Sequence, residues 1–206
     1  MLNKTSILII ILFAISIKVS AQYTQEEILN KPCFVGSTGF MLMNIIPDDE
    51  SPNFIQLNLG YRISPKDAIS LEQKKWRYFE PLGIPYGNLK TDPNENFPGF
   101  IQEKGFAIVY QRFLWKGLYS SIHVMNAWQD FINENGQKID DGFQIFNTYR
   151  IGYHIKLFKK AFFIEPSLAI THRPYHTKMP DEFRNMDEKW SKFFFGEPGL
   201  HFGFNF

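Results

Sequence analysis

The stretch GFQIFNTYRIGYHIKL, residues 142–157, divides its side chains into two kinds with a period of two. The apolar members are Phe143, Ile145, Tyr149, Ile151, Tyr153, Ile155 and Leu157. The other face carries Gln144, Thr148, Arg150, Gly152, His154 and Lys156. Because successive residues of a β-strand point to opposite faces of the sheet, the pattern predicts a strand with one apolar and one polar face.

The same alternation recurs in FIQLNLGYRI, residues 54–63, and in AFFIEPSLAIT, residues 161–171. Around Val109 and Ile122 apolar residues fall on both faces, so the phase there is undetermined. Turn residues divide the chain into eight predicted strands. These are Phe34–Asn44, Phe54–Ile63, Ala68–Phe79, Lys104–Leu114, Leu118–Trp128, Gly142–Leu157, Ala161–His172 and Phe193–Phe206.

The predicted connections between these strands alternate in length. Three short turns contain SPKD, WKG and FKK. Four long loops are predicted, at NIIPDDESP, from Pro81 to Glu103, around NENGQKIDD and from Arg173 to Ser191. This alternation is typical of an all-β, eight-stranded, up-and-down antiparallel barrel with both termini at the short-turn end. Ten strands remain an alternative if the segment from Pro81 to Glu103 contains a further hairpin.

Two kinds of barrel fit such strands. A soluble lipocalin-like barrel places its apolar face inside, around a ligand, whereas a transmembrane barrel places it outside, against lipid. Aromatic residues fall near both predicted ends of the strands, which suggests girdles at two membrane interfaces. They are Trp76, Tyr78, Phe79 and Trp128 at the long-loop end, and Trp115 and Tyr119 at the short-turn end. With Arg, His, Lys and Glu on the opposite face, the pattern favours the transmembrane barrel.

The N-terminal residues 1–21, MLNKTSILIIILFAISIKVSA, have the features of a cleaved signal peptide. Lys4 precedes an apolar run of about eleven residues, shorter than the roughly 20 that a membrane helix needs, and Val19-Ser20-Ala21 supplies a cleavage pattern. We therefore expect export, a short periplasmic segment at residues 22–33 and a barrel at residues 34–206. Cys33 is the only cysteine, so no internal disulfide is expected.

Charge gives no sign of nucleic-acid binding. Without Lys4 and Lys18, the 22 basic residues of the full chain become 20 against 21 acidic residues, a net charge near −1. A nucleic-acid-binding domain usually carries a basic excess.

The chain ends with FFFGEPGLHFGFNF, residues 193–206, in which Glu197 is followed by a glycine and alternate aromatics. Phe194, Leu200, Phe202, Phe204 and Phe206 are predicted to face lipid. The ending resembles the β-signal of bacterial outer-membrane proteins, carried here by Gly199, Phe202, Phe204 and Phe206. The chain as a whole resembles the small outer-membrane β-barrels of OmpA or OmpX type. That resemblance implies a place in the cell outer membrane of a Gram-negative bacterium, contact with its lipid and assembly by the barrel-assembly machinery, but no reaction.

The predicted interior carries charges of both signs. These residues are Arg62, Glu72, Arg150, His154, Glu165, Glu197 and His201. Eight strands enclose only enough space for side chains, and buried charges need partners, so we expect a polar network and no open pore. If Lys159-Lys160 forms a tight turn, His154 faces Glu165. Because proline cannot donate to a ladder, we also expect a bulge at Pro166 and at Pro198, turning the preceding Glu inward.

The sequence favours a structural or surface-interaction role, with no identified partner for the long loops. The alternative is a lipid-modifying acyl hydrolase or acyltransferase, with Ser121 as nucleophile, His123 as base and Glu72 or Glu165 orienting the base. The motifs of lipid A deacylases and palmitoyltransferases are absent from the sequence. No cofactor or metal site is predicted, since His172 and His176 fall in a predicted loop. A soluble ligand-binding barrel is the third alternative.

Overall fold

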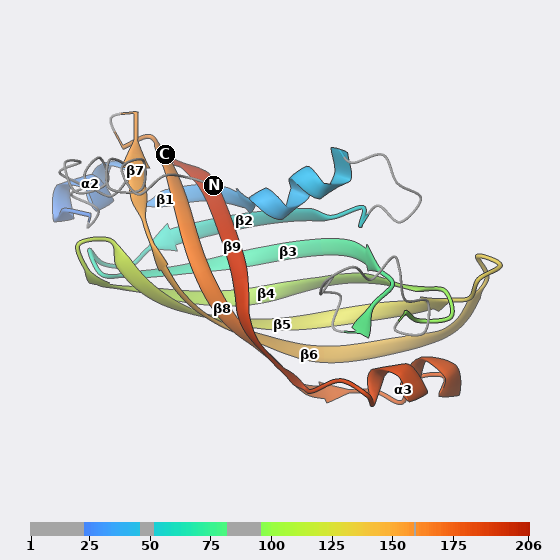
Figure 1. Cartoon of the computed structure of the whole chain (residues 1–206). Coiled ribbons are helices and arrows are strands. Elements are labelled where there is room, and N and C mark those ends of the chain that lie inside the picture. The colour runs from blue at the N-terminus through green and yellow to red at the C-terminus, as the bar shows by residue number, and fades with distance from the viewer. Residues whose placement is uncertain (1–22, 46–51, 82–95, 159) are drawn as a thin grey trace, which may run out of the picture.

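The computed structural model describes residues 23–45, 52–81, 96–158 and 160–206. Within them, one antiparallel sheet of nine strands closes into a ring, because β6, at one end of the strand order, also pairs with β8 (Figure 1). The strands are β1 (Cys33–Thr38), β2 (Ile55–Arg62), β3 (Asp67–Tyr78), β4 (Phe100–Trp115), β5 (Leu118–Ile132), β6 (Lys138–Tyr153), β7 (Ile155–Leu157), β8 (Phe162–His176) and β9 (Phe193–Asn205). The helices are α2 (Gln25–Asn30), the 3-10 helix η1 (Gly39–Ile45) and α3 (Asp181–Asp187).

The strand predicted at 142–157 is divided at His154, which is why nine strands are observed where eight are predicted. Its two parts, β6 and β7, both pair with β8. The register is the same on either side of the break, since Ile151 pairs with Leu168 and Ile155 with Ile164. This is the register expected from a tight turn at Lys159-Lys160, of which Lys159 lies outside the described residues.

The apolar face of the sheet points outward. Along β2 and its continuation, Ile55, Leu57, Leu59, Tyr61 and Ile63 are each between 50% and 57% exposed, whereas the alternate Gln56 and Arg62 are buried. The two strands of undetermined phase behave alike, with Ile108 and Ile122 exposed and Val109 buried. This orientation is the reverse of that expected for a soluble lipocalin-like barrel.

The aromatic residues predicted to form girdles do not all point outward. Trp115 and Trp128, at opposite ends of β4 and β5, are 64% and 45% exposed. By contrast Trp76, Tyr78 and Tyr119 are buried inside the ring. Trp76 and Tyr78 share the inner face of β3 with Glu72, and Tyr119 shares the inner face of β5 with Ser121. The alternation along the strand, and not closeness to its end, therefore decides whether these side chains point inward or outward.

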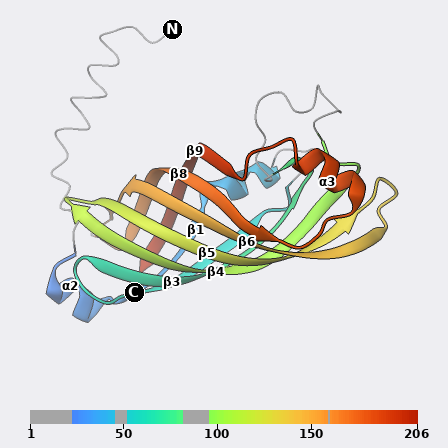
Figure 2. The same ribbon diagram turned by 90° about the horizontal axis from the view of Figure 1, so that it is seen from below.

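Several predicted boundaries are wrong. The first strand ends at Thr38 and not at Asn44, because the chain turns into η1 at Gly39. The connection at NENGQKIDD is a tight turn, since β5 and β6 continue to Ile132 and Lys138 and Asn133 bonds Gln137 through backbone and side chain. The loop predicted after His172 instead contains the end of β8 and then α3. The strands β4, β5 and β6 extend toward the end of the ring where α3 lies, and α2 lies at the opposite end (Figure 2).

The two prolines do not sit at bulges. Pro166 pairs regularly with Leu200, and Leu168 pairs regularly with Pro198. Pro166 is tolerated because it lies opposite the break between β6 and β7. Pairing of β8 with β6 ends at Ser167 and pairing with β7 begins at Ile164, so no N–H of residue 166 is needed for a ladder hydrogen bond on that side. Pro198 is tolerated because β1 pairs with β9 only from His201 onward.

The irregularity of β9 falls instead at Gly196. The partner of Ala169 is Glu197, but that of Ile170 is Phe195, which leaves Gly196 as the extra residue with φ of +85°, a conformation that favours glycine. The bulge reverses the phase of the preceding residues. Phe193 and Phe195 are therefore exposed, and Phe194 lines an interior cavity, contrary to its predicted lipid-facing position.

Within the described ranges no helix has the length and apolar character required to cross a membrane. The predicted signal peptide, residues 1–21, lies outside the described residues, as do residues 82–95 of the segment that could hold a further hairpin.

Candidate functional site

The interior of the ring contains three groups of polar side chains at successive heights. The lower group, at the short-turn end, consists of Tyr23, Arg62, Gln111, His154, Glu165 and Asn205. The middle group consists of Asn58, Glu72, Ser121, His123, Arg150, Ser167, Glu197 and His201. The upper group consists of Trp76, Tyr78, Glu103, Gln129 and Gln144. All seven interior residues predicted from the sequence belong to the lower or middle group.

The lower group is centred on the predicted pair. His154 Nδ1 lies 2.6 Å from Glu165 Oε1, which also accepts a 2.9 Å hydrogen bond from Gln111. On its other side His154 Nε2 lies 2.9 Å from the hydroxyl of Tyr23. His154 is buried, and these two contacts satisfy both of its ring nitrogens.

Tyr23 connects this pair to Arg62. The Arg62 guanidinium donates to the Tyr23 hydroxyl and to Asn205 Oδ1, both at 2.7 Å, and stacks 3.9 Å above the Tyr23 ring. Burial disfavours the phenolate and raises the pKa of Tyr23 to about 12, although Arg62 acts in the opposite direction. Tyr23 is therefore a neutral hydroxyl at physiological pH and closes the lower end of the lumen.

Helix α2 holds Tyr23 in place. Thr24 and Glu27 form a capping box at its N-terminus, and Ile28 packs in a cluster with Tyr23, Phe113 and Tyr119. The Glu27 carboxylate also accepts bonds from Lys156, at 3.2 Å, and from Lys160. Burial alone would raise the pKa of Glu27, but these lysines and the Thr24 amide together lower it to about 2.

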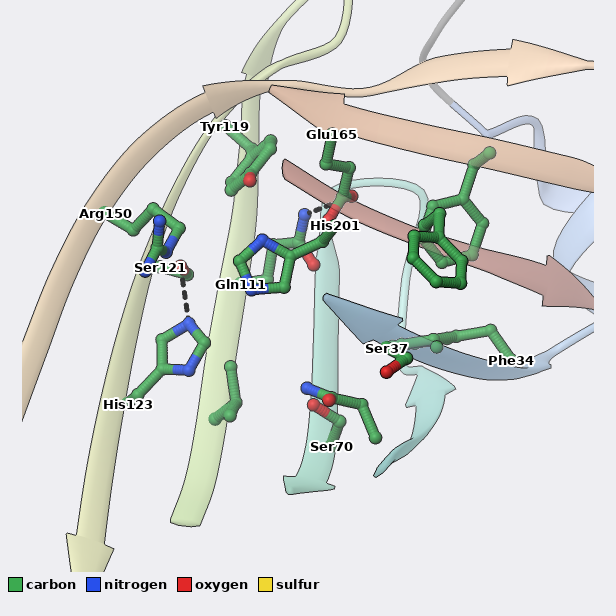
Figure 3. Close-up of a pocket in the computed structure, with 15 residues that line it drawn as sticks. Phe34, Ser37, Ser70, Gln111, Tyr119, Ser121, His123, Arg150, Glu165 and His201 are labelled. Atoms are coloured by element: carbon green, nitrogen blue, oxygen red, sulfur yellow. Dashed lines mark hydrogen bonds between the residues drawn. The ribbon is translucent and has the colours of Figure 1, made fainter. Parts of the chain in front are cut away.

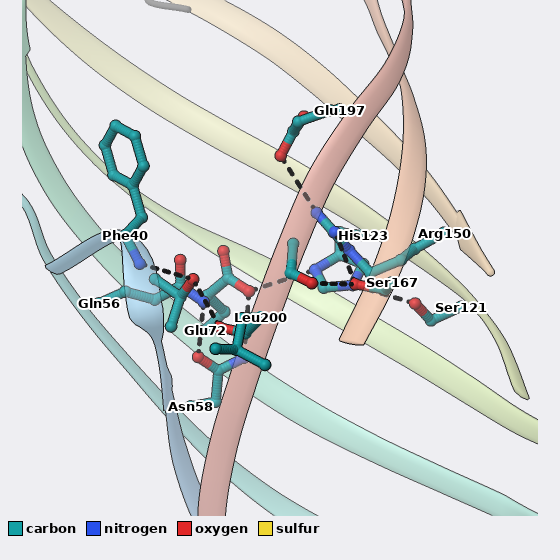
Figure 4. Close-up of polar contacts among 12 residues, drawn as sticks. Phe40, Gln56, Asn58, Glu72, Ser121, His123, Arg150, Ser167, Glu197 and Leu200 are labelled. Atoms are coloured by element: carbon teal, nitrogen blue, oxygen red, sulfur yellow. Dashed lines mark hydrogen bonds and ion pairs between the residues drawn. The ribbon is translucent and has the colours of Figure 1, made fainter. Parts of the chain in front are cut away.

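The middle group contains Ser121, His123 and Glu72 in hydrogen-bonded sequence (Figure 4). Ser121 Oγ lies 3.1 Å from His123 Nε2, and His123 Nδ1 lies 3.2 Å from Glu72 Oε2. Glu72 additionally accepts from Asn58 at 3.1 Å. With Nδ1–H donating to Glu72, Nε2 of His123 is an acceptor facing the serine hydroxyl. The candidate pair Ser121 and His123 is thus brought together, and Glu72, not Glu165, is its carboxylate partner.

Arg150 lies beside this triad. It is the direct cross-strand neighbour of Ser121, and it donates to Ser167 at 3.0 Å and to Glu197 at 3.2 Å. Its Nε has no hydrogen-bond partner in the described structure, and neither does Nδ1 of His201. Gly199 leaves room for these side chains, because a Cβ at this position would lie 2.1 Å from Arg150 Nη1 and 2.8 Å from Ser167 Oγ and would displace them.

Two adjoining cavities border the middle group. The smaller, about 40 Å³, is lined by Ser121, His123, Arg150, Glu165 and His201 among others (Figure 3). The larger, about 400 Å³, shares His123, Arg150 and His201 with it; we call it the chamber. Aromatic side chains form much of the chamber wall: Phe40, Phe54, Trp76, Phe146 and Phe194.

The upper group separates the chamber from the long-loop end. Glu103 accepts hydrogen bonds from Trp76 at 2.9 Å, from Tyr78 at 3.1 Å and from Gln144 at 2.5 Å. Above it lies an apolar cluster that includes Ile101, Phe131 and Phe183 of α3. The buried Arg173–Asp187 pair, with contacts of 2.7 and 2.5 Å, fixes α3 to β8.

Sequence reasoning missed Tyr23, Glu103 and Asn205. Asn205 carried a usable signal, because alternation extended from His201 reaches it, whereas the sequence leaves undetermined the phase of the strand that contains Glu103. Nothing in the local sequence of Tyr23 indicated its place inside the ring. Among the described residues, no group of three or more His, Cys, Asp or Glu side chains is arranged to hold a metal ion. No protein-family model matches the chain, and no curated protein matches it.

Proposed function

We propose that the protein is an integral β-barrel of the bacterial outer membrane whose polar lumen is closed at both ends. The observation that carries the proposal is the continuous outward apolar surface. Besides β2, it includes Ile69, Leu71, Ile108, Tyr110, Ile122, Val124, Tyr149, Ile151, Leu168 and Phe204. A surface of this extent is far larger than a soluble monomer exposes, and lipid is the environment that makes it favourable.

Backbone pairing supports the same proposal. Closure of the ring leaves few strand edges, as a hydrocarbon environment requires. The sequence adds the features expected of a signal peptide, and the terminal residues Gly199, Phe202, Phe204 and Phe206 resemble a β-signal. On this proposal, insertion proceeds through the barrel-assembly machinery, and the N-terminal segment with α2 lies in the periplasm.

The interior argues against a general pore. Tyr23 and α2 fill the short-turn end, and among the described residues the Glu103 group and the cluster around Phe183 fill the other. Eight positions around the ring, with β6 and β7 sharing one, match the interior width that side chains can fill. We therefore propose a structural or surface-interaction role, carried by the loops, the lipid-facing wall or the chamber. The residues do not identify a partner for the long-loop end.

Membrane fractionation combined with a heat-modifiability gel tests this function. The expected result is recovery in the outer-membrane fraction and a shift in gel mobility on boiling, because a folded barrel resists detergent until it is heated. A soluble periplasmic protein with no mobility shift would overturn it and would leave the soluble barrel as the alternative.

A further inference from the structure

The ring wall has an incomplete section beside the chamber. β1 pairs with β2 only from Asn58 to Tyr61 and with β9 only from His201 to Asn205. Above β1, Ile55–Leu57 of β2 and Phe193–Leu200 of β9 each pair, among the described residues, with a strand on one side only. We call the section between these two segments the side window.

Helix η1 covers the side window without closing it as a strand would. Thr38, the last residue of β1 before η1, donates to the Leu200 carbonyl at 3.3 Å on the β9 side. Asn44 of η1 exchanges two bonds with the Phe54 backbone, at 2.6 and 2.7 Å, on the β2 side. Leu42 and Ile45 of η1 are 63% and 74% exposed. The cover is thus apolar outside and is held by side-chain hydrogen bonds, and the chamber behind it is lined by residues from both window edges.

From these observations we propose that the protein hydrolyses acyl esters of membrane lipids, with Ser121 as nucleophile, His123 as general base and Glu72 as the residue that positions His123. The proposal rests on the barrel lying in a membrane, because the acyl chain would reach the chamber through the side window. The order of contacts, Ser Oγ to Nε2 and Nδ1 to a carboxylate, is the arrangement that activates a serine.

The proposed reaction is hydrolysis of an ester in two steps, and water is the second reactant. Ser121 Oγ attacks the ester carbonyl, its proton passes to His123 Nε2, and His123 delivers that proton to the departing alcohol oxygen. Water then attacks the acyl-serine with His123 again taking and returning one proton, which releases the fatty acid and restores Ser121. The acyl chain occupies the aromatic chamber, and the carbonyl occupies the smaller cavity where the two spaces meet.

Arg150 supplies a positive charge beside the oxyanion that the reaction forms. Its side chain is 6% exposed, lies across the strands from Ser121 and has an unpartnered Nε. A cationic donor beside the nucleophile stabilises the oxyanion that forms on the carbonyl.

The test uses the full mature barrel folded in detergent micelles, with p-nitrophenyl butanoate and dodecanoate as substrates and a decyl fluorophosphonate as covalent probe. Wild type is expected to hydrolyse dodecanoate and to be labelled at Ser121. Ser121→Ala should lose labelling and lower hydrolysis at least about 100-fold, whereas the matched control Ser120→Ala, on the outer face of β5, should retain both. Equal labelling of Ser121→Ala, or no reaction of the folded wild type, would overturn the proposal.

Two further variants test the role of Glu72 and the route of the acyl chain. Glu72→Gln should lower kcat with little change in KM, because it acts through His123 and does not bind the ester. Gln56→Trp, at the window edge, should lower dodecanoate hydrolysis more than butanoate hydrolysis. An equal effect on both chain lengths would overturn passage through the side window.

The heat-modifiability gel on every variant confirms folding before rates are compared. A membrane-inserted, heat-modifiable wild type that does not react overturns only the esterase. A protein that stays soluble overturns the barrel proposal itself.

Discussion

Tyr23, which precedes the first strand, and His154, in the break between β6 and β7, form a 2.9 Å hydrogen bond although 131 positions separate them. The N-terminal segment is therefore part of the barrel floor. Since His154 in turn contacts Glu165, and Tyr23 contacts Arg62 and Asn205, one connected set of side chains ties the start of the chain to β2, β8 and β9.

Tyr23→Phe tests this floor. The substitution keeps the ring but removes the hydroxyl that accepts from buried Arg62, and a hydrogen bond to a charged group contributes about 1.5–3 kcal/mol. We expect a loss of that size in the free energy of unfolding, measured by urea titration in micelles. Tyr61→Phe, on the lipid-facing surface, is the control and should change stability little; an equal loss in the two variants would contradict the assignment.

Glu165→Gln tests the predicted His154–Glu165 pair. The amide retains the shape of the carboxyl group but weakens a charge-assisted bond to His154 and Gln111, so we expect the thermal midpoint of the gel shift to fall. The loss in stability should again be about 1.5–3 kcal/mol. Glu134→Gln, in the exposed β5–β6 turn, serves as control. Unchanged stability of Glu165→Gln would mean that the carboxylate contributes nothing to the buried network.

The attachment of α2 should depend on pH through Glu27. Its pKa is lowered from 4.5 to about 2 in the folded protein, so the unfolded state binds the proton first as the pH falls. The stability that Glu27 contributes is fully present above pH 4.5 and is lost as the pH falls through about 2. The difference in unfolding free energy between wild type and Glu27→Gln should therefore shrink across that window. A difference that is constant from pH 6 to about pH 2 would exclude this role.

Closure of the ring between β1 and β9 depends on Gly203. A Cβ there would lie 2.3 Å from the Val35 carbonyl oxygen, which is backbone and cannot move aside as a flexible side chain can. We expect Gly203→Ala to cost about 1–3 kcal/mol and to reduce the folded fraction seen on the gel. Gly39→Ala, whose nearest contacts would be 3.3 to 3.5 Å, is the matched control. Equal behaviour of the two variants would show that this seam is not tightly packed.

The parts of the fold that followed from the sequence are those governed by local rules. Period-two alternation identified the face that carries Leu57 and Leu59, and counting outward from one tight turn placed His154 opposite Glu165. Both inferences hold because a strand has a fixed period and a hairpin a fixed register.

The errors arise where a single residue changes the phase or where the partner is distant. The extra residue Gly196 shifts the register of β9 by one position, so Phe194 points inside. β1 ends at Thr38 because the chain continues as η1, whose Asn44 bonds the backbone of Phe54. The partnership of Glu72 with His123 could be narrowed to two carboxylates but not decided, because it depends on the registers with which β3 and β5 pair with β4, the strand between them. No local pattern encodes those registers.

The outward direction of the apolar face into lipid is the central claim, and a nitroxide scan along residues 55–63 in phospholipid bilayers tests it most directly, after Cys33→Ser removes the native thiol. Labels at Ile55, Leu57, Leu59, Tyr61 and Ile63 should collide readily with oxygen and hardly with an aqueous nickel chelate, because oxygen concentrates in lipid. Labels at Gln56, Asn58 and Arg62 should be poorly accessible to both. Ready collision of the nickel chelate with the labels at Leu57, Leu59 and Tyr61 would contradict a lipid-embedded barrel.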